Sequence, residues 1–190
     1  KICKKNVTRN YETNVLGEHN VLNLTMAIAV VKQFGIEDKV IEDAIKNISL
    51  TDMRFQIIEK GDLTYINDAY NASPTSMKAA VDVISDLNDF EFKTLVLGSM
   101  FELGPNEVEY HSGIGTYINN NSRGINLVIS VGDLAKNITD NINNKDISTL
   151  HFSTVEEVTD YLKANKHKNE VILFKASRSM KLETIINNIK

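Results

Sequence analysis

Apolar residues follow two periods along this chain, and together these periods predict strands alternating with helices. Short apolar or alternating runs predict strands over residues 5–16, 53–59, 63–68, 94–97, 127–131, 149–152 and 171–174. Apolar positions spaced three and four apart predict helices over residues 21–34, 40–48, 77–87, 106–121, 134–142 and 181–189. A capping box formed by Thr154 and Glu157 predicts the start of one more helix.

The order of these elements predicts an α/β fold with a Rossmann-like, mostly parallel and doubly wound sheet. The runs at 94–97, 127–131 and 171–174 are continuously apolar, which is typical of strands buried on both faces. Residues 60–62, Lys-Gly-Asp, separate the two earlier strands and predict a hairpin. We place a domain boundary at the linker-like residues 49–52. A small helix and strand domain then covers residues 1–50, and the sheet domain covers residues 51–190.

Composition narrows the function classes. The chain has 190 residues and a net charge of −4, which argues against a nucleic-acid-binding surface because phosphates need a basic face. Its one cysteine, Cys3, excludes an internal disulfide and favours a reducing, cytoplasmic location. We expect no membrane span, because no apolar run approaches the required ~20 residues. The chain lacks an initiator methionine, so we expect it to be a fragment of a longer protein.

The polar stretch Asn67–Met77 lies between a predicted strand and a predicted helix. Ser73 is a good N-cap and Pro74 suits the first helical position, so a helix N-terminus with free N–H groups adjoins the loop. Ligands of open α/β sheets bind at such strand ends. Asp68 can therefore hydrogen-bond a ribose hydroxyl, and Asn71 can orient a ligand group. The alternative is that both residues only close an Asx-type turn.

Two further loops follow predicted buried strands and carry polar residues. In the loop at 98–105, Glu102 can hold an ammonium group or be a solvated turn residue. In the segment 175–179, two cations and two hydroxyls can bind a carboxylate, or Ser177 can be an ordinary cap among surface charges. His111, on the helix after the first of these loops, has the pattern of a structural or surface histidine.

Three other polar residues are ambiguous when taken singly. Asn20 and Asn23 share a helical face and can read the edge of a purine, or they can be an N-cap and a solvated first-turn residue. Arg54, in a predicted strand, can bind a phosphate or form a surface ion pair. The sequence contains no Ser/His/Asp nucleophile set, no His/Cys cluster with metal spacing and no Gly-x-x-x-x-Gly-Lys-Ser/Thr phosphate loop.

In their order and spacing, these residues resemble the Mur ligase family over nearly the whole chain. Asp68 to Met77, with its Asp-x-Tyr-Asn-Ala-x-Pro core, is the most specific part and is similar to the branch that adds D-alanyl-D-alanine to UDP-N-acetylmuramoyl-tripeptide. The resemblance also rests on Gly17-x-His19-Asn20-x-x-Asn23, Arg54, Leu97-Gly98-x-Met100-x-Glu102-Leu103-Gly104, His111 and Lys175-x-Ser177-Arg178.

The resemblance implies an ATP-dependent amide ligase of peptidoglycan precursor synthesis that works through an acyl phosphate. It implies that residues 1–50 end a central ATP-binding domain and that residues 51–190 form the C-terminal domain, which is inactive alone. Asn20 and Asn23 would contact adenine, and Arg54, Asp68 and Asn71 would reach the rest of ATP. The dipeptide would be held by Ser99, Glu102, Lys175, Ser177 and Arg178. No catalytic residue is assigned in this chain, and the Mg²⁺ ligands are expected outside it.

Two residues depart from the family pattern. Ser99 stands where the family usually has Asp, so we expect one carboxylate fewer near the dipeptide. Ala176 stands where the family usually has Gly, and a positive φ there would strain it. These departures motivate an alternative, a Mur-like ligase with a different amine substrate. A further alternative is a non-catalytic α/β binding module that has kept the fold.

Overall fold

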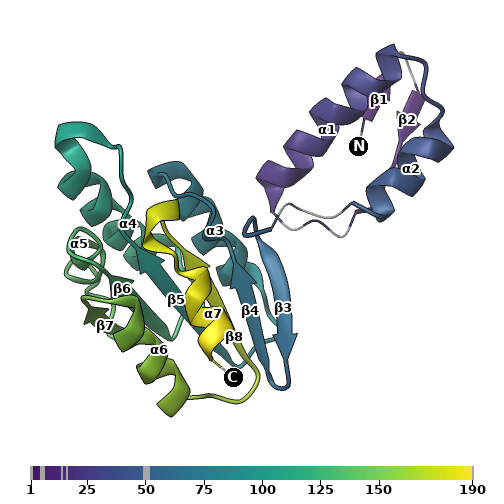
Figure 1. Cartoon of the computed structure of the whole chain (residues 1–190). Coiled ribbons are helices and arrows are strands. Elements are labelled where there is room, and N and C mark those ends of the chain that lie inside the picture. The colour runs from purple at the N-terminus through teal and green to yellow at the C-terminus, as the bar shows by residue number, and fades with distance from the viewer. Residues whose placement is uncertain (1, 5–6, 14, 16, 49–51, 190) are drawn as a thin grey trace. The chain divides into compact units, whose positions relative to one another are not determined.

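The computed structural model describes residues 2–4, 7–13, 15, 17–48 and 52–189. It divides the chain into two compact units, residues 1–50 and residues 51–190 (Figure 1). Each unit is therefore described by itself.

The first unit combines a short hairpin with two helices. Strands β1 (Ile2–Lys4) and β2 (Val7–Arg9) pair antiparallel, and helices α1 (Glu18–Gln33) and α2 (Asp38–Lys46) follow. Ile28, Ile41 and Ile45 form its buried core. The Tyr11 hydroxyl donates to Asp38 Oδ1 at 2.7 Å, and the pairing of Asp38 with Lys32 ties the end of α1 to the start of α2.

The hairpin is shorter than the strand predicted over residues 5–16. Strand β2 ends at Arg9, which pairs with Ile2, and residues 10–13 are not in a strand. Residues 5, 6, 14 and 16 lie outside the described part. The two predicted helices are confirmed, and α1 ends as predicted before Gly35, whose φ of +76° suits glycine.

The second unit is built on one six-stranded sheet of order β3-β4-β8-β5-β6-β7. All its pairs are parallel except β3–β4. This confirms the predicted, mostly parallel sheet and the predicted hairpin. The strands are β3 (Gln56–Lys60), β4 (Leu63–Asn67), β5 (Phe92–Gly98), β6 (Leu127–Val131), β7 (Ser148–Phe152) and β8 (Glu170–Lys175).

Helices cover both faces of this sheet (Figure 1). Helices α3 (Pro74–Asp86), α4 (Glu107–Asn121) and α5 (Lys136–Thr139) pack in sequence along one face. Helices α6 (Val155–Ala164) and α7 (Glu183–Asn188) cover the other. Alternate strand residues such as Val96, Ile172 and Phe174 form one core cluster with α6 and α7. Strands β5, β6 and β8 are therefore buried on both sides, as their continuous apolar runs predicted.

Three predicted elements begin late or end early for backbone reasons. The predicted strand at 53–59 starts only at Gln56, because Met53 and Phe55 have φ of +61° and +53°, which an extended strand cannot accommodate. The predicted helix at 134–142 shrinks to α5, because its flanking turns use shorter i to i+3 hydrogen bonds. The last helix starts at Glu183, after the 3₁₀ turn η2 (Arg178–Met180) and a left-handed Lys181.

A helix that crosses a bilayer has to be both long enough and apolar enough. Within the described ranges, no helix meets both requirements.

Candidate functional site

The strand order creates a divergence of loops at one edge of the sheet. Strand β8 lies between β4 and β5, and its carboxyl end leads to α7 on one face. The carboxyl ends of β4 and β5 lead instead to α3 and α4 on the opposite face. Neighbouring parallel strands whose connections leave in opposite directions open a crevice, and this is where ligands of open α/β sheets bind.

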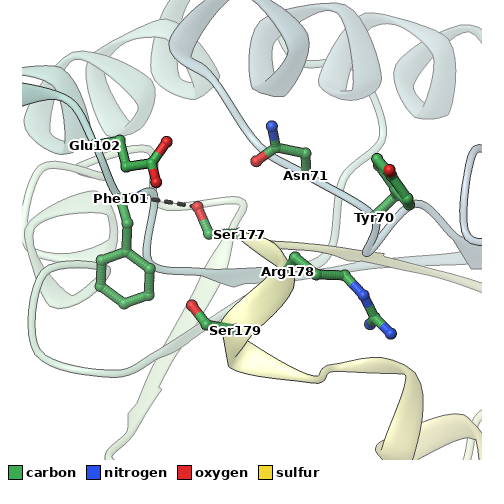
Figure 2. A pocket seen from close by; sticks show the side chains of 7 residues that line it. All are labelled: Tyr70, Asn71, Phe101, Glu102, Ser177, Arg178 and Ser179. Atoms are coloured by element: carbon green, nitrogen blue, oxygen red, sulfur yellow. Dashed lines mark hydrogen bonds between the residues drawn. The ribbon is translucent and has the colours of Figure 1, made fainter.

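A cleft of about 510 Å³ occupies this divergence. It is lined by side chains from all three loops, with Phe101 and Glu102 at one side, Tyr70 at the other and Ser177 between them (Figure 2). The complete lining is Tyr70, Asn71, Phe101, Glu102, Ser177, Arg178 and Ser179. A carboxylate, a guanidinium, an amide and hydroxyls in one cleft suit a small zwitterionic ligand.

The loop after β4 is held by its own side chains. Asn67 Oδ1 accepts a hydrogen bond from the Ala69 N–H at 3.3 Å, so Asn67 rather than Asp68 forms the Asx turn. Ser73 and Ser76 exchange hydrogen bonds as a capping box, with Pro74 at the start of α3, which confirms the predicted helix start. The alternative in which both residues only close a turn is therefore wrong for Asp68, whose carboxylate is engaged elsewhere, while Asn71 Oδ1 accepts from the adjacent Ala72 N–H at 2.8 Å.

Asp68 pairs with Lys175 across adjacent strand ends. Lys175 Nζ lies 2.5 Å from Asp68 Oδ2, and the two side chains are 3% and 16% exposed. The same ammonium donates to the Asn71 carbonyl at 3.1 Å. Asp68 Oδ1 accepts from the Phe55 N–H at 3.1 Å. Lys175 thus belongs with Asp68 and does not line the cleft, although it was predicted with the dipeptide residues.

Arg54 lies in the turn before β3 rather than in a strand. Its guanidinium stacks over the Tyr70 ring at 4.3 Å from the ring centre, and its side chain remains exposed. The predicted surface ion pair is not among the contacts of Arg54 in the described residues. Stacking places an exposed cation beside the residue that lines one side of the cleft.

The loop after β5 is held by two hydrogen bonds that its backbone N–H groups donate to side chains. The Met100 N–H donates to His111 Nε2 at 2.8 Å, and the Phe101 N–H donates to Ser177 Oγ at 2.8 Å. Because Nε2 accepts, His111 carries its proton on Nδ1, which donates to the Glu107 carbonyl at 2.6 Å. Burial lowers the pKa of His111. The neutral imidazole therefore fixes the loop that presents Glu102, whose own φ is +63°.

The two departures from the family pattern have local explanations. Ser99 is buried, and its Oγ accepts from the Ala135 N–H at 3.3 Å, so its side chain is turned toward the start of α5 and away from the cleft. Ala176 is also buried, and it does not have the positive φ that would strain it. Its Cβ instead faces Gly98, where an added Cβ would lie only 2.6 Å away.

The remaining predicted residues separate into two places. Glu102, Ser177 and Arg178 line the cleft as a group, and Asn71, predicted with the ATP residues, joins them there. Arg178 is half-exposed and pairs with Glu183 Oε1 at 2.5 Å. Asn20 and Asn23 belong to the first unit, where Gly17 rather than Asn20 is the N-cap of α1. Asn20 is partly buried and Asn23 is exposed.

Two cleft residues escaped sequence reasoning, namely Tyr70 and Phe101, whereas Ser179 is one of the two hydroxyls predicted in the segment 175–179. The two aromatic rings adjoin the predicted Asn71 and Glu102 in sequence, and both are more than one third exposed. An exposed aromatic residue beside a polar loop residue is the signal that could have found them.

A bound metal ion needs several acidic, histidine or cysteine side chains around it. Within the described ranges, no group of three such residues could hold a metal ion.

Comparison with known proteins gives consistent matches. Residues 53–178 match the family described as Mur ligase, glutamate ligase domain. The chain is 39% identical over 192 residues to the UDP-N-acetylmuramoyl-tripeptide–D-alanyl-D-alanine ligase of Bacillus subtilis, a match that covers 97% of this chain and 41% of that protein. The ligase of the same name from Haemophilus influenzae is 33% identical, over 92% of this chain and 38% of the relative.

Solved structures agree on the fold. A MurF structure from Acinetobacter baumannii superposes with a TM-score of 0.84 at 27% identity, over 94% of this chain and 39% of that one. The chain thus spans about two fifths of the length of the relatives it matches.

Proposed function

The chain belongs to the Mur ligase family, and from that premise we propose that it is the C-terminal portion of a UDP-N-acetylmuramoyl-tripeptide–D-alanyl-D-alanine ligase. The curated relatives of that name support this assignment. The observation that carries it is the cleft at the divergence of β4, β8 and β5, which collects the motif residues of three separate loops. We place the activity in the cytoplasm, where its nucleotide substrates are made.

The proposed reaction forms one amide bond at the expense of ATP. The tripeptide carboxylate attacks the γ-phosphorus of ATP, and the acyl phosphate and ADP form. The amine of D-alanyl-D-alanine then attacks the acyl carbon, and inorganic phosphate leaves. Catalysis of this kind depends on positioning and on stabilising charge. A C-terminal unit that closes over the substrates would complete such a site.

The residues near Asp68 fit a nucleotide, which needs a cation for its phosphates and an acceptor for its ribose. Arg54 supplies an exposed guanidinium suited to phosphate oxygens. Asp68 keeps lone pairs beyond its two hydrogen bonds and some exposure, so it can accept from a ribose hydroxyl. Asn20 and Asn23 are proposed to contact adenine from the first unit. The Mg²⁺ that such transfer uses is proposed to have its ligands outside the described residues.

The cleft residues fit the dipeptide by charge. Glu102 is an exposed carboxylate that is proposed to attract the dipeptide ammonium. Arg178 is a half-exposed guanidinium that pairs with Glu183 and is proposed also to bind the dipeptide carboxylate. Ser177 is proposed to act through its hold on the Phe101 N–H. Lys175 and Ser99, which do not line the cleft, are proposed to act on the dipeptide only through other residues.

The proposal is tested by phosphate release from the full-length protein. ATP consumption is expected only when UDP-N-acetylmuramoyl-tripeptide and D-alanyl-D-alanine are both present. No release with all three substrates would sink the proposal. The alternative amine substrate is tested with a panel of dipeptides and amino acids read by product mass. Its motivation is weak, because Ser99 and Ala176 both turn away from the cleft.

The non-catalytic alternative makes a separate prediction. If the module only binds, Asp68→Ala in the full-length protein would leave activity unchanged. The proposed ligase would lose its activity, because Asp68 connects Lys175 at the strand end to the turn that carries Arg54, and both Asp68 and Arg54 are proposed to face the nucleotide.

A further inference from the structure

We propose that Lys175 is a positioning residue that couples the nucleotide side of this site to the dipeptide cleft. The identities of the two ligands rest on the proposed function. The coupling itself rests on one ammonium group that holds both Asp68 and the backbone of Asn71.

Lys175 occupies a strand position from which its ammonium reaches both groups. Its strand, β8, runs between β4 and β5, and Lys175 is in register with Leu97 on β5. On the other side, the Asp68 N–H donates to the Phe174 carbonyl at 2.9 Å, so Asp68 continues the ladder beside Lys175. The ammonium therefore emerges at the centre of the three diverging loops.

One contact of Lys175 leads to the nucleotide side. Asp68 Oδ2 is 2.5 Å from the ammonium, and Asp68 Oδ1 accepts from the Phe55 N–H. That N–H belongs to the turn that carries Arg54. Asp68 is thereby held between a strand end and this turn, and its side chain stays 16% exposed.

The other contact leads to the cleft. Lys175 Nζ donates to the Asn71 carbonyl at 3.1 Å, while the side chains of Asn71 and Tyr70 line the cleft. The Tyr70 N–H donates in turn to the Met53 carbonyl, in the same turn as Arg54. Removing the ammonium releases the loop at Asn71 and leaves the carboxylate of Asp68 without its cation.

Lys93 provides a matched control within the same sheet. It is 5% exposed, and its ammonium donates to the Ser85 carbonyl at 2.9 Å. It lies at the amino end of β5, whereas Lys175 lies at the carboxyl end of β8. Lys93→Met and Lys175→Met remove the same buried charge, so a general loss of stability affects both and a loss of coupling affects only Lys175→Met.

The first readout is hydrogen exchange of the full-length protein without ligand. Lys175→Met is expected to speed exchange at residues 68–72, and Lys93→Met is expected to leave these residues as in the wild type. Lys175→Arg is expected to be intermediate, since it keeps the charge but changes its geometry. Equal exchange at 68–72 in Lys175→Met and the wild type would overturn the positioning role, whether or not the protein is a ligase.

The second readout is equilibrium binding of a non-hydrolysable ATP analogue and, separately, of D-alanyl-D-alanine. Lys175→Met is expected to weaken both by about tenfold, a factor typical of one lost charge-assisted hydrogen bond. Weakening of only one ligand would overturn the coupling. If the wild type binds neither ligand, the proposed function fails, while the exchange result still decides the positioning role.

Discussion

Two buried lysines at opposite ends of one sheet have different surroundings. Lys175, at the carboxyl end of β8, pairs with a carboxylate and adjoins the cleft. Lys93, at the amino end of β5, donates to the Ser85 carbonyl, and burial lowers its pKa. The difference shows that burial alone does not make a lysine part of a site. A lysine becomes part of a site when its partner is charged and when the loops around it diverge.

The amino end contains a second buried charge that is satisfied internally. Glu170 is 1% exposed, accepts from the Thr94 hydroxyl at 2.5 Å and from the His167 N–H at 3.2 Å. Burial raises its pKa. The buried charged groups at the amino end therefore hydrogen-bond within the core, whereas those at the carboxyl end lie next to a cleft.

The largest expected effect is that of Asp68→Ala. It leaves the ammonium of Lys175 buried without its carboxylate, which should cost roughly 3 kcal/mol, the low end for a broken buried pair because Asp68 keeps some exposure. Urea unfolding measures this. Asp140→Ala is the control, since it removes an exposed pair with Lys136 and should cost about 0.5 kcal/mol. Equal costs for the two variants would contradict the contrast between buried and exposed pairs.

Gly98→Ala tests how closely the carboxyl ends of β5 and β8 approach. The new Cβ would lie 2.6 Å from the Cβ of Ala176, and such overpacking should cost about 1–3 kcal/mol. The double variant Gly98→Ala/Ala176→Gly removes that clash and should recover most of the loss. Thermal unfolding of both variants is the measurement, and a double variant no more stable than the single one would refute this account of Ala176.

Much of this architecture could be predicted from the sequence. Continuous apolar strands and the Ser73 cap identified the sheet and the start of α3, because burial and capping are local patterns. The partner of Asp68 could not be predicted, since Lys175 is 107 positions away and strand order alone brings them together. The direction of the Ser99 side chain could not be predicted for the same reason, because it depends on the distant Ala135.

Glu170→Gln tests the amino end through pH. The raised pKa of Glu170 means that its stabilising contribution is present below its ordinary value of 4.5 and is lost as pH rises through the folded pKa. The wild type should therefore gain stability relative to Glu170→Gln on acidification, by about 1.4 kcal/mol per unit of pKa difference. Chemical unfolding of both proteins from pH 7 to pH 4 measures this. If the free energies of unfolding of the two proteins changed in parallel with pH, Glu170 would not be the group that titrates.

His111 should show the opposite sign near the carboxyl end, with the smallest effect. Its lowered pKa means that stability is fully present above the ordinary value of 6.5 and is lost as pH falls toward the folded pKa. The free energy of unfolding of the wild type should fall between pH 7 and pH 5, and that of His111→Gln should not. The same decline in both proteins would show that another group titrates.

We propose that ligands meet this domain at the carboxyl ends of β4, β8 and β5. Hydrogen exchange of the full-length protein, with and without a non-hydrolysable ATP analogue, UDP-N-acetylmuramoyl-tripeptide and D-alanyl-D-alanine, tests it most directly. Protection within the sheet domain is predicted at residues 67–73, 98–104 and 175–182 and not at the amino-end residues 91–93 and 167–170. Protection at the amino-end residues, with none at the three loops, would contradict the account.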